Sequence, residues 1–195
     1  LEAEPGRRWA WSSAGAMVLS DLAARALTDS TLPEVRRRMV ADYLHTRLLD
    51  PLGMRAAVAE FDAAGTMLGG AMIHASARDW GRLGEFLRQR GAVGGAQVVP
   101  TEWVKFMASA NPRNRGFGAM RWLARGAPSS GPGLFPPGAP GDAFACSGGR
   151  GELVLVAPTQ GLTLVRLGRS DADQRGGLRG RLGAILTLFG AAAGD

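Results

Sequence analysis

Residues 142–168 read DAFACSGGRGELVLVAPTQGLTLVRLG, and this stretch decides the fold. Two runs rich in β-branched and aliphatic residues, 152–157 and 162–167, flank the turn-forming Pro158-Thr159-Gln160-Gly161. The pattern predicts an antiparallel hairpin. After it, residues 176–190 have helical spacing, and we expect this helix to pack on the hairpin sheet. Its predicted inward face consists of Leu178, Leu182, Ile185, Leu186 and Phe189.

The start of this stretch, ACSGG at 145–149, is similar to the nucleophile elbow of α/β-hydrolases. An elbow needs a helix directly after the turn, whereas here a second strand is predicted. That class also places its histidine after the serine, and the only histidines, His45 and His74, precede Ser147. Ser147 is therefore not predicted to be an elbow nucleophile.

The composition is that of one globular domain, which we expect to span residues 1–195. Of the residues, 46% are hydrophobic, yet no apolar run approaches the length of a membrane span. No signal-peptide core is recognised near the start. Cys146 is the only cysteine, which excludes an internal disulfide and a cysteine-based zinc site.

A net charge of +6 and a pI near 11.0 raise the question of nucleic-acid binding. The basic residues are scattered, however, and the only run is Arg36-Arg37-Arg38, within a predicted helix. No nucleic-acid recognition motif accompanies them. We therefore expect no nucleic-acid partner.

The remainder of the chain reads as helices and loops, which with the terminal hairpin and closing helix predicts an α+β fold. The first helix, 14–27, carries Val18, Leu22 and Ala26 at helical spacing, with Leu19 and Ala23 alongside. The other expected elements are a helix over 32–49 with Thr31 as N-cap, a helix begun by Ser76 and Asp79, a short helix capped by Thr101, and a short strand over 117–123.

Four stretches in this order resemble the C-terminal part of the serine β-lactamase and penicillin-binding-protein superfamily. The similarity is greatest to its class C-like branch, which includes esterases and 6-aminohexanoate-dimer hydrolases. The stretches are PGRRWAWSSAGAMVLSDL (5–22), LLDPLGM (48–54), GTMLGGAMIHASARDWGRLGEFL (65–87) and FACSGGRGELVLVAPTQGLTLVRLG (144–168). The resemblance implies the C-terminal portion of the β-lactamase/transpeptidase-like fold.

In that family, the serine of an S-x-x-K motif attacks a carbonyl and the lysine helps to activate it. A tyrosine in a Y-x-N loop relays the proton, and a K-T-G strand lines the opposite wall and supplies an oxyanion-binding N–H. The resemblance places Trp11 at the tyrosine position and Ser13 at the third position of that motif. The strand triplet falls on Cys146-Ser147-Gly148, and Gly149 is the implied oxyanion amide.

The implied catalytic positions are thus Trp11, Ser13, Ser147 and Gly149, and the implied substrate-binding positions are Ser12, Cys146, Gly148 and Arg150. We further predict that Trp11 and Ser13 converge on one cleft with the backbone of Ser147–Gly149, open on the side of a missing N-terminal segment and bordered there by exposed apolar surface.

The chain departs from the family pattern in three ways. No S-x-x-K occurs, so the chain resembles a part that begins after that motif. Trp11 replaces the tyrosine, and an indole N–H cannot act as a general acid or base. The K-T-G lysine is absent, which favours ester or amide substrates over penicillins.

Simpler interpretations stay open beside these roles. Ser12 or Ser13 could cap the next helix, Trp11 could be core packing, and Cys146 could be a small buried hydrophobe. Glycines 148, 149 and 151 could form a bulge at the hairpin entry.

The leading hypothesis is the C-terminal part of a serine hydrolase that acts on a small ester, amide or peptide-like substrate without a cofactor or metal. The alternative is a catalytically degenerate module that binds a ligand or peptide. The resemblance is to bacterial proteins and favours a periplasmic location.

Overall fold

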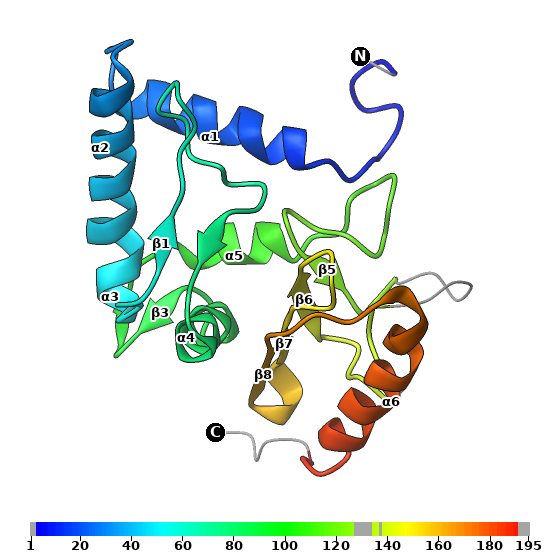
Figure 1. The fold of residues 1–195 in the computed structure, drawn as a ribbon. Helices are drawn as coiled ribbons and strands as arrows, with labels where there is room; N and C mark the ends of the chain where they lie inside the picture. The colour runs from blue at the N-terminus through cyan, green and yellow to red at the C-terminus, as the bar shows by residue number, and fades with distance from the viewer. Residues whose placement is uncertain (1–2, 127–133, 137, 191–195) are drawn as a thin grey trace. The chain divides into compact units, whose positions relative to one another are not determined.

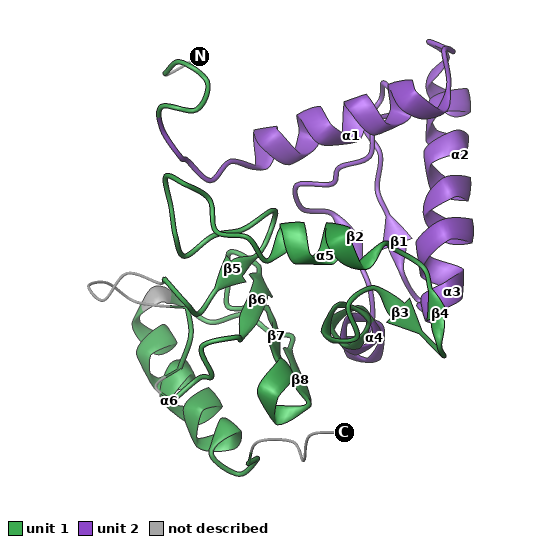
Figure 2. Ribbon diagram, turned by 180° about the vertical axis from the view of Figure 1, so that it is seen from behind, with its two compact units in different colours: residues 1–7, 83–195 green, residues 8–82 purple. Residues whose placement is uncertain are grey.

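A computed structural model describes residues 3–126, 134–136 and 138–190 (Figure 1). The chain forms two compact units, one of residues 8–82 and one of residues 1–7 with 83–195 (Figure 2). The expectation of a single domain over 1–195 stays a prediction. None of the described helices is long and apolar enough to cross a membrane.

The unit of residues 83–195 is built on a four-stranded antiparallel sheet in the order β5-β6-β7-β8. Its strands are β5 Trp122–Leu123, β6 Phe144–Ser147, β7 Leu153–Ala157 and β8 Leu162–Arg166. Between β7 and β8, a 3-10 turn at Pro158–Gln160 ends at Gly161, whose φ of 62° suits glycine. The predicted hairpin is confirmed, and only the end of 117–123 forms a strand.

Helix α6, Arg175–Leu186, covers one face of this sheet (Figure 1). Its buried Leu182 and Leu186 pack with the inward residues of β6 and β7, among them Ala145 and Leu155. The predicted closing helix is thus confirmed, although it ends before 190. Ile185 and Phe189 are exposed, and their predicted inward position was wrong because the buried stripe follows Leu178, Leu182 and Leu186 at a strict four-residue spacing.

The other face of the sheet meets a glycine of α4, Ala77–Arg88. A Cβ on Gly84 would lie 2.5 Å from the Thr163 side chain and 2.9 Å from that of Val154, so the absence of a side chain permits this close approach. After the short β3 and β4 hairpin (Ala92–Val93, Ala96–Gln97) comes α5, Thr101–Met107. Pro100 occupies the N-cap of α5 without a side-chain hydrogen bond, so the predicted Thr101 cap was wrong.

The unit of residues 8–82 contains α1 Ser13–Leu27 and α2 Pro33–Leu44, followed by a π-helical turn His45–Leu49 and α3 Asp50–Leu52. The paired strands are β1 Val58–Ala59 and β2 Ile73–His74. Leu32 is the N-cap of α2 and makes no side-chain cap, which corrects the prediction of Thr31. The capping box predicted for α4 is confirmed, because the Ser76 hydroxyl accepts from Asp79 N–H at 3.1 Å and the Asp79 carboxylate accepts from Ser76 N–H at 3.4 Å.

Helix α1 buries three small residues and exposes three of its large apolar ones. Ala16, Ser20 and Ala24 are buried, whereas Val18 and Leu22 on the opposite face and Leu19 to one side are exposed. The glycine-rich segment explains the buried side, because a Cβ on Gly69 would clash with Ser20 Oγ. The apolar spacing of 14–27 thus predicted the helix correctly but not the face that packs.

Candidate functional site

The end of the β6–β7 hairpin holds the strand triplet singled out by sequence. Strand β6 pairs with β5 only at Phe144 and Ala145, so it continues past its neighbour. On its other side, Ser147 pairs with Leu153, and Gly148 N–H donates to the Glu152 carbonyl at 2.9 Å. Because backbone groups alternate along a strand, the N–H and C=O of Ser147 point to the edge that β5 leaves open. Ser147 therefore carries a backbone donor and acceptor that neither β5 nor β7 pairs.

The three residues of the hairpin loop, 149–151, are fixed through their carbonyl groups. Arg175 Nη2 donates to the Gly149 carbonyl at 2.8 Å, the Ser170 amide donates to the Arg150 carbonyl at 2.7 Å, and Arg166 Nη1 donates to the Gly151 carbonyl at 2.8 Å. All three donors come from residues 166–175, which run from the last residue of β8 to the first residue of α6. The loop is held rigidly although it lies at the surface.

Glu152 fixes the same loop through its amides. Its carboxylate accepts the Arg150 N–H at 2.9 Å. Hydrogen bonds from its own backbone N–H and from that of Arg150 hold the pKa of Glu152 below its ordinary value. A Cβ on Gly148 would lie 2.5 Å from Glu152 Oε2, so a side chain there would displace the carboxylate from the loop amides. Gly151 requires glycine, because its φ is 94°.

Gly149 differs from Gly148 and Gly151 in having free space around its Cα. It is exposed, a Cβ there would meet open space, and its φ is not in the left-handed region. Within residues 3–126, 134–136 and 138–190, its N–H meets no hydrogen-bond acceptor. The loop therefore presents an accessible amide donor next to the open edge at Ser147.

Cys146 lies beside a buried arginine that the sequence reading missed. Arg121 is 2% exposed, and its Nε and Nη2 donate to the carbonyls of Met107 and Val104 at the end of α5, at 3.0 and 2.9 Å. Its guanidinium stacks 4.1 Å from the centre of the Phe144 ring. Burial raises the pKa of the Cys146 thiol, and the charge of Arg121 only partly opposes this. Cys146 is therefore a neutral, half-buried thiol. The only sequence signal for the buried Arg121 was a single charge within an apolar run.

The second group of candidate residues lies at the start of α1. Ser12 is the N-cap of this helix, and its Oγ accepts the Ala14 N–H at 3.1 Å. The capping interpretation is thus confirmed for Ser12, while Ser13 is the first helical residue. Gly70 packs against this turn, because a Cβ on it would lie 2.7 Å from the Ser13 carbonyl oxygen. Trp11 precedes the cap and is 48% exposed.

The two groups belong to different units, so their predicted convergence on one cleft stays a prediction. Ser12, Ser13 and Trp11 are contiguous in one unit, and Cys146, Ser147, Gly148, Gly149 and Arg150 are contiguous in the other. Lys105, the only lysine, is exposed and bound to Glu102 at 2.7 Å.

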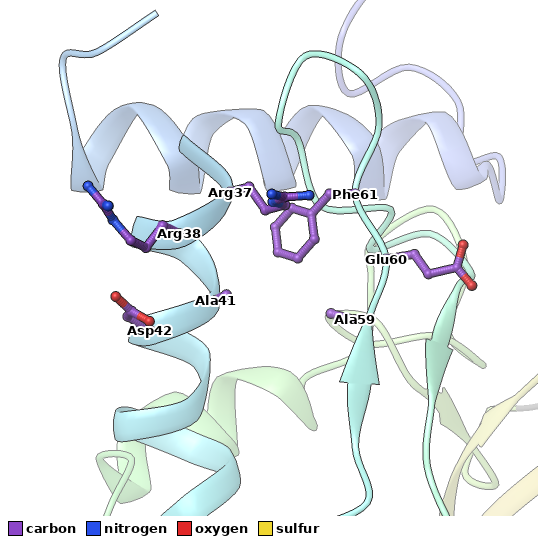
Figure 3. Close-up of a pocket in the computed structure, with 7 residues that line it drawn as sticks. All are labelled: Arg37, Arg38, Ala41, Asp42, Ala59, Glu60 and Phe61. Carbon is purple, nitrogen blue, oxygen red and sulfur yellow. The ribbon is translucent and has the colours of Figure 1, made fainter. Parts of the chain in front are cut away.

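A shallow hollow of about 460 Å³ lies between α2 and β1 (Figure 3). Arg37 and Phe61 point toward each other across it, while Arg38 and Asp42 extend away on the far side of the helix and Glu60 points away from it. Its charged groups do not converge on a common point, and none of the predicted site residues lines it.

His74 is exposed and binds Glu60 at 2.7 Å. In the part of the chain that is described, no three His, Cys, Asp or Glu residues cluster as metal ligands.

Comparison with known proteins gives matches in structure alone. No protein-family model matches the chain, and no curated protein matches its sequence. A β-lactamase from Mycobacterium bovis superposes with a TM-score of 0.69 at 17% identity, over 95% of this chain and 66% of its own. A Bacillus anthracis protein assigned as a 6-aminohexanoate-dimer hydrolase gives 0.70 at 18% identity, over 95% of this chain and 46% of its own.

A Bacteroides dorei protein assigned as a β-lactamase gives a TM-score of 0.58 at 16% identity, over 87% of this chain and 54% of its own. The chain therefore spans 46 to 66% of the length of these three proteins. Identities this low establish the fold and leave the activity to be tested. The chain has the C-terminal portion of the β-lactamase-like fold.

Proposed function

We propose that this chain is the C-terminal part of a β-lactamase-like serine hydrolase that cleaves ester or amide bonds through an acyl-enzyme. One observation carries the proposal: an unpartnered, exposed Gly149 amide lies next to an open strand edge, in a loop whose neighbouring groups are all held by hydrogen bonds. An amide held in this way needs little reorganisation to receive an oxyanion, and such preorganised donors are a major source of catalysis in acyl transfer.

In the proposed reaction, a serine outside residues 1–195 attacks the substrate carbonyl carbon and gives its proton to the neighbouring lysine. The oxyanion accepts the Gly149 N–H, while the backbone N–H and C=O of Ser147 hold the substrate along the β6 edge and Gly148 leaves space beside it. Collapse breaks the ester or amide bond, the leaving group takes a proton, and water then hydrolyses the acyl-serine. Arg150 flanks the substrate, and Ser13 and Trp11 line the leaving-group side.

The first experiment is labelling with a fluorophosphonate probe. The 195-residue chain alone should not react, because the nucleophile and its lysine are absent, whereas the chain joined to a segment that carries S-x-x-K should be labelled once, on that segment. Stoichiometric labelling of Ser147 in the 195-residue chain would overturn the assignment.

A second experiment tests the amide donor in the joined chain. Gly149→Pro removes the N–H and should lower kcat for a p-nitrophenyl ester by about 10²–10³-fold, the usual cost of one oxyanion donor. Gly149→Ala keeps the N–H in open space and is the matched control, expected to stay within about threefold of the parent. Equal losses in both variants would contradict the role of the amide.

The alternative, a ligand-binding module without catalysis, is favoured by Trp11 alone, because its indole cannot relay a proton. The joined chain distinguishes the two. A module should bind the ester or the corresponding amide without turnover, and Trp11→Tyr should then not create activity.

A further inference from the structure

Met120 holds a backbone conformation that residues with a side chain rarely adopt. In the described part of the chain, two non-glycine residues have a positive φ, Arg90 at 55° and Met120 at 60°. Arg90 has an ordinary reason, because it follows α4, where the Gly91 N–H donates to the Phe86 carbonyl at 2.9 Å and closes the helix end. Met120 closes no helix, and it is 45% exposed. Strained residues of this kind are concentrated at ligand-binding sites.

The strained residue lies at the tip of a tight hairpin that leads into β5. Gly118 N–H donates to the Arg121 carbonyl at 2.9 Å, so Ala119 and Met120 are the two turn residues. A turn position with a positive φ is normally filled by glycine or asparagine, because a larger side chain is strained there. Stability alone would therefore favour glycine at position 120, and the long apolar side chain of methionine calls for another explanation.

Both neighbours of Met120 are anchored to the rest of the unit. Ala119 N–H donates to the Met107 carbonyl at 3.2 Å. The buried Arg121 donates to two carbonyls of α5 and stacks on the Phe144 ring. Its Nη1 is buried as well, and no atom of the described residues accepts a hydrogen bond from it, which is an unfavourable arrangement. A strained backbone persists only where its surroundings hold it, and here they hold Met120 at the surface.

The strand register places this tip beside the open edge of β6. Trp122 pairs with Ala145, and continuing the antiparallel register by two residues brings Met120 level with Ser147. Because the chain turns back at Met120, β5 ends before it can pair with Ser147. The open edge therefore has the Gly149 amide beyond its end and Met120 across from it.

The chemistry of methionine suits contact with a flexible apolar ligand. Its side chain is unbranched, has three rotatable bonds and ends in a polarizable thioether, so it adapts to the shape of an alkyl chain. A ligand whose carbonyl oxygen accepts the Gly149 N–H, and which extends back along the Ser147 backbone, passes Met120. Burial of its methylene groups against Met120 would then add to the binding.

We propose that Met120 forms a subsite for an aliphatic acyl chain, so that the preferred substrates are esters or amides of unbranched fatty acids of several carbons. The inference rests on the proposed function in one respect: it takes the carbonyl at Gly149 to be the one that is attacked. The subsite itself consists of residues from one unit, 83–195, and its binding can be tested with the 195-residue chain alone.

The test follows the methionine methyl groups by NMR while N-methyloctanamide or N-methylbutanamide is added. The two probes share one amide and differ in chain length, and the Met120 signal is assigned through its loss in Met120→Leu. N-methyloctanamide should shift the Met120 signal saturably and bind about tenfold or more tightly than N-methylbutanamide, for which a lower limit on Kd is sufficient. Met39 of α2 is the matched control, because it is 37% exposed on ordinary helical backbone, and its signal should not move.

Met120→Gly distinguishes a ligand contact from a structural role. Glycine suits the left-handed turn, so the Tm of this variant should equal or exceed that of the parent, while its affinity for N-methyloctanamide should fall about fivefold or more. Met39→Ala should leave that affinity unchanged. A lower Tm accompanying the loss of binding would mean that Met120 only supports the fold, and it would overturn the proposal. Equal shifts of the Met120 and Met39 signals, or no preference for the longer amide, would overturn it as well.

Turnover by the joined chain separates this inference from the proposed function. N-methyloctanamide binding at Met120 without hydrolysis of p-nitrophenyl octanoate or acetate keeps the aliphatic subsite and removes the hydrolase. Hydrolysis of both esters, with a ratio of kcat/KM values that Met120→Gly leaves unchanged, keeps the hydrolase and removes the subsite.

Discussion

Helices α1 and α6 have similar apolar patterns and opposite surroundings. In α6, Leu182 and Leu186 are buried against the sheet. In α1, the largest apolar residues are exposed and the buried positions are two alanines and a serine. Periodicity thus identifies a helix and an apolar face, but it does not reveal whether the chain supplies a surface for that face.

The difference follows from what each helix packs against. A sheet face built from Ala145, Leu155 and neighbouring aliphatic residues accepts branched side chains and gains from their burial. The inner side of α1 meets the backbone of Gly69 and Gly70 so closely that only small side chains fit. The close approach of the Gly69-Gly70 backbone, and not the hydrophobicity of the side chains, therefore determines which face of α1 is buried.

The largest effect is expected for Leu186→Ala in α6. Leu186 is 1% exposed within the core of the sheet, so truncation leaves a cavity and should lower the free energy of unfolding by about 2–5 kcal/mol. Denaturant unfolding followed by circular dichroism measures this. Leu188→Ala is the matched control, because Leu188 is 79% exposed, and it should cost less than about 0.5 kcal/mol. Equal losses would show that α6 does not cover the sheet in solution.

An intermediate effect is expected for Ala24→Leu on the inner side of α1. Ala24 is 0% exposed, and the added side chain would have to displace closely packed neighbours, at a cost of about 1–3 kcal/mol. Ala26→Leu adds the same atoms on the exposed side and should be nearly neutral. If both variants are equally stable, the inner face of α1 is not close-packed, and the contrast with α6 loses its basis.

The sequence predicted much of the fold because its signals are local. The hairpin, the capping box at Ser76 and Asp79 and the closing helix each depend on residues within a few positions of one another. It did not predict the role of Arg121, whose partners Met107 and Val104 lie in a separate helix. Likewise, the donors that fix the 149–151 loop come from residues 166–175, and no local pattern links them to it. The candidate site was recognised through a resemblance, and the convergence of its two groups remains a prediction.

A smaller, pH-dependent effect is expected at Glu152. Its pKa is lowered in the folded chain, so its contribution to stability is complete above its ordinary pKa near 4.5 and is lost as the pH falls through the lower folded value. Glu152→Gln should therefore unfold at a lower Tm than the parent at pH 7, and the difference should shrink below pH 4. Thermal unfolding from pH 3 to 7 measures it. A difference independent of pH would mean that the carboxylate charge plays no part in holding the loop amides.

The smallest effect is expected for Leu22→Ala on the exposed side of α1. Leu22 is 55% exposed, so its removal leaves no cavity, and alanine has a slightly higher helix propensity than leucine. The free energy of unfolding should change by less than about 0.5 kcal/mol, an order of magnitude below the effect of Leu186→Ala. Denaturant unfolding of the two variants side by side measures both effects. A loss for Leu22→Ala as large as that for Leu186→Ala would show that this face of α1 is covered in solution, and the contrast between the two helices would then disappear.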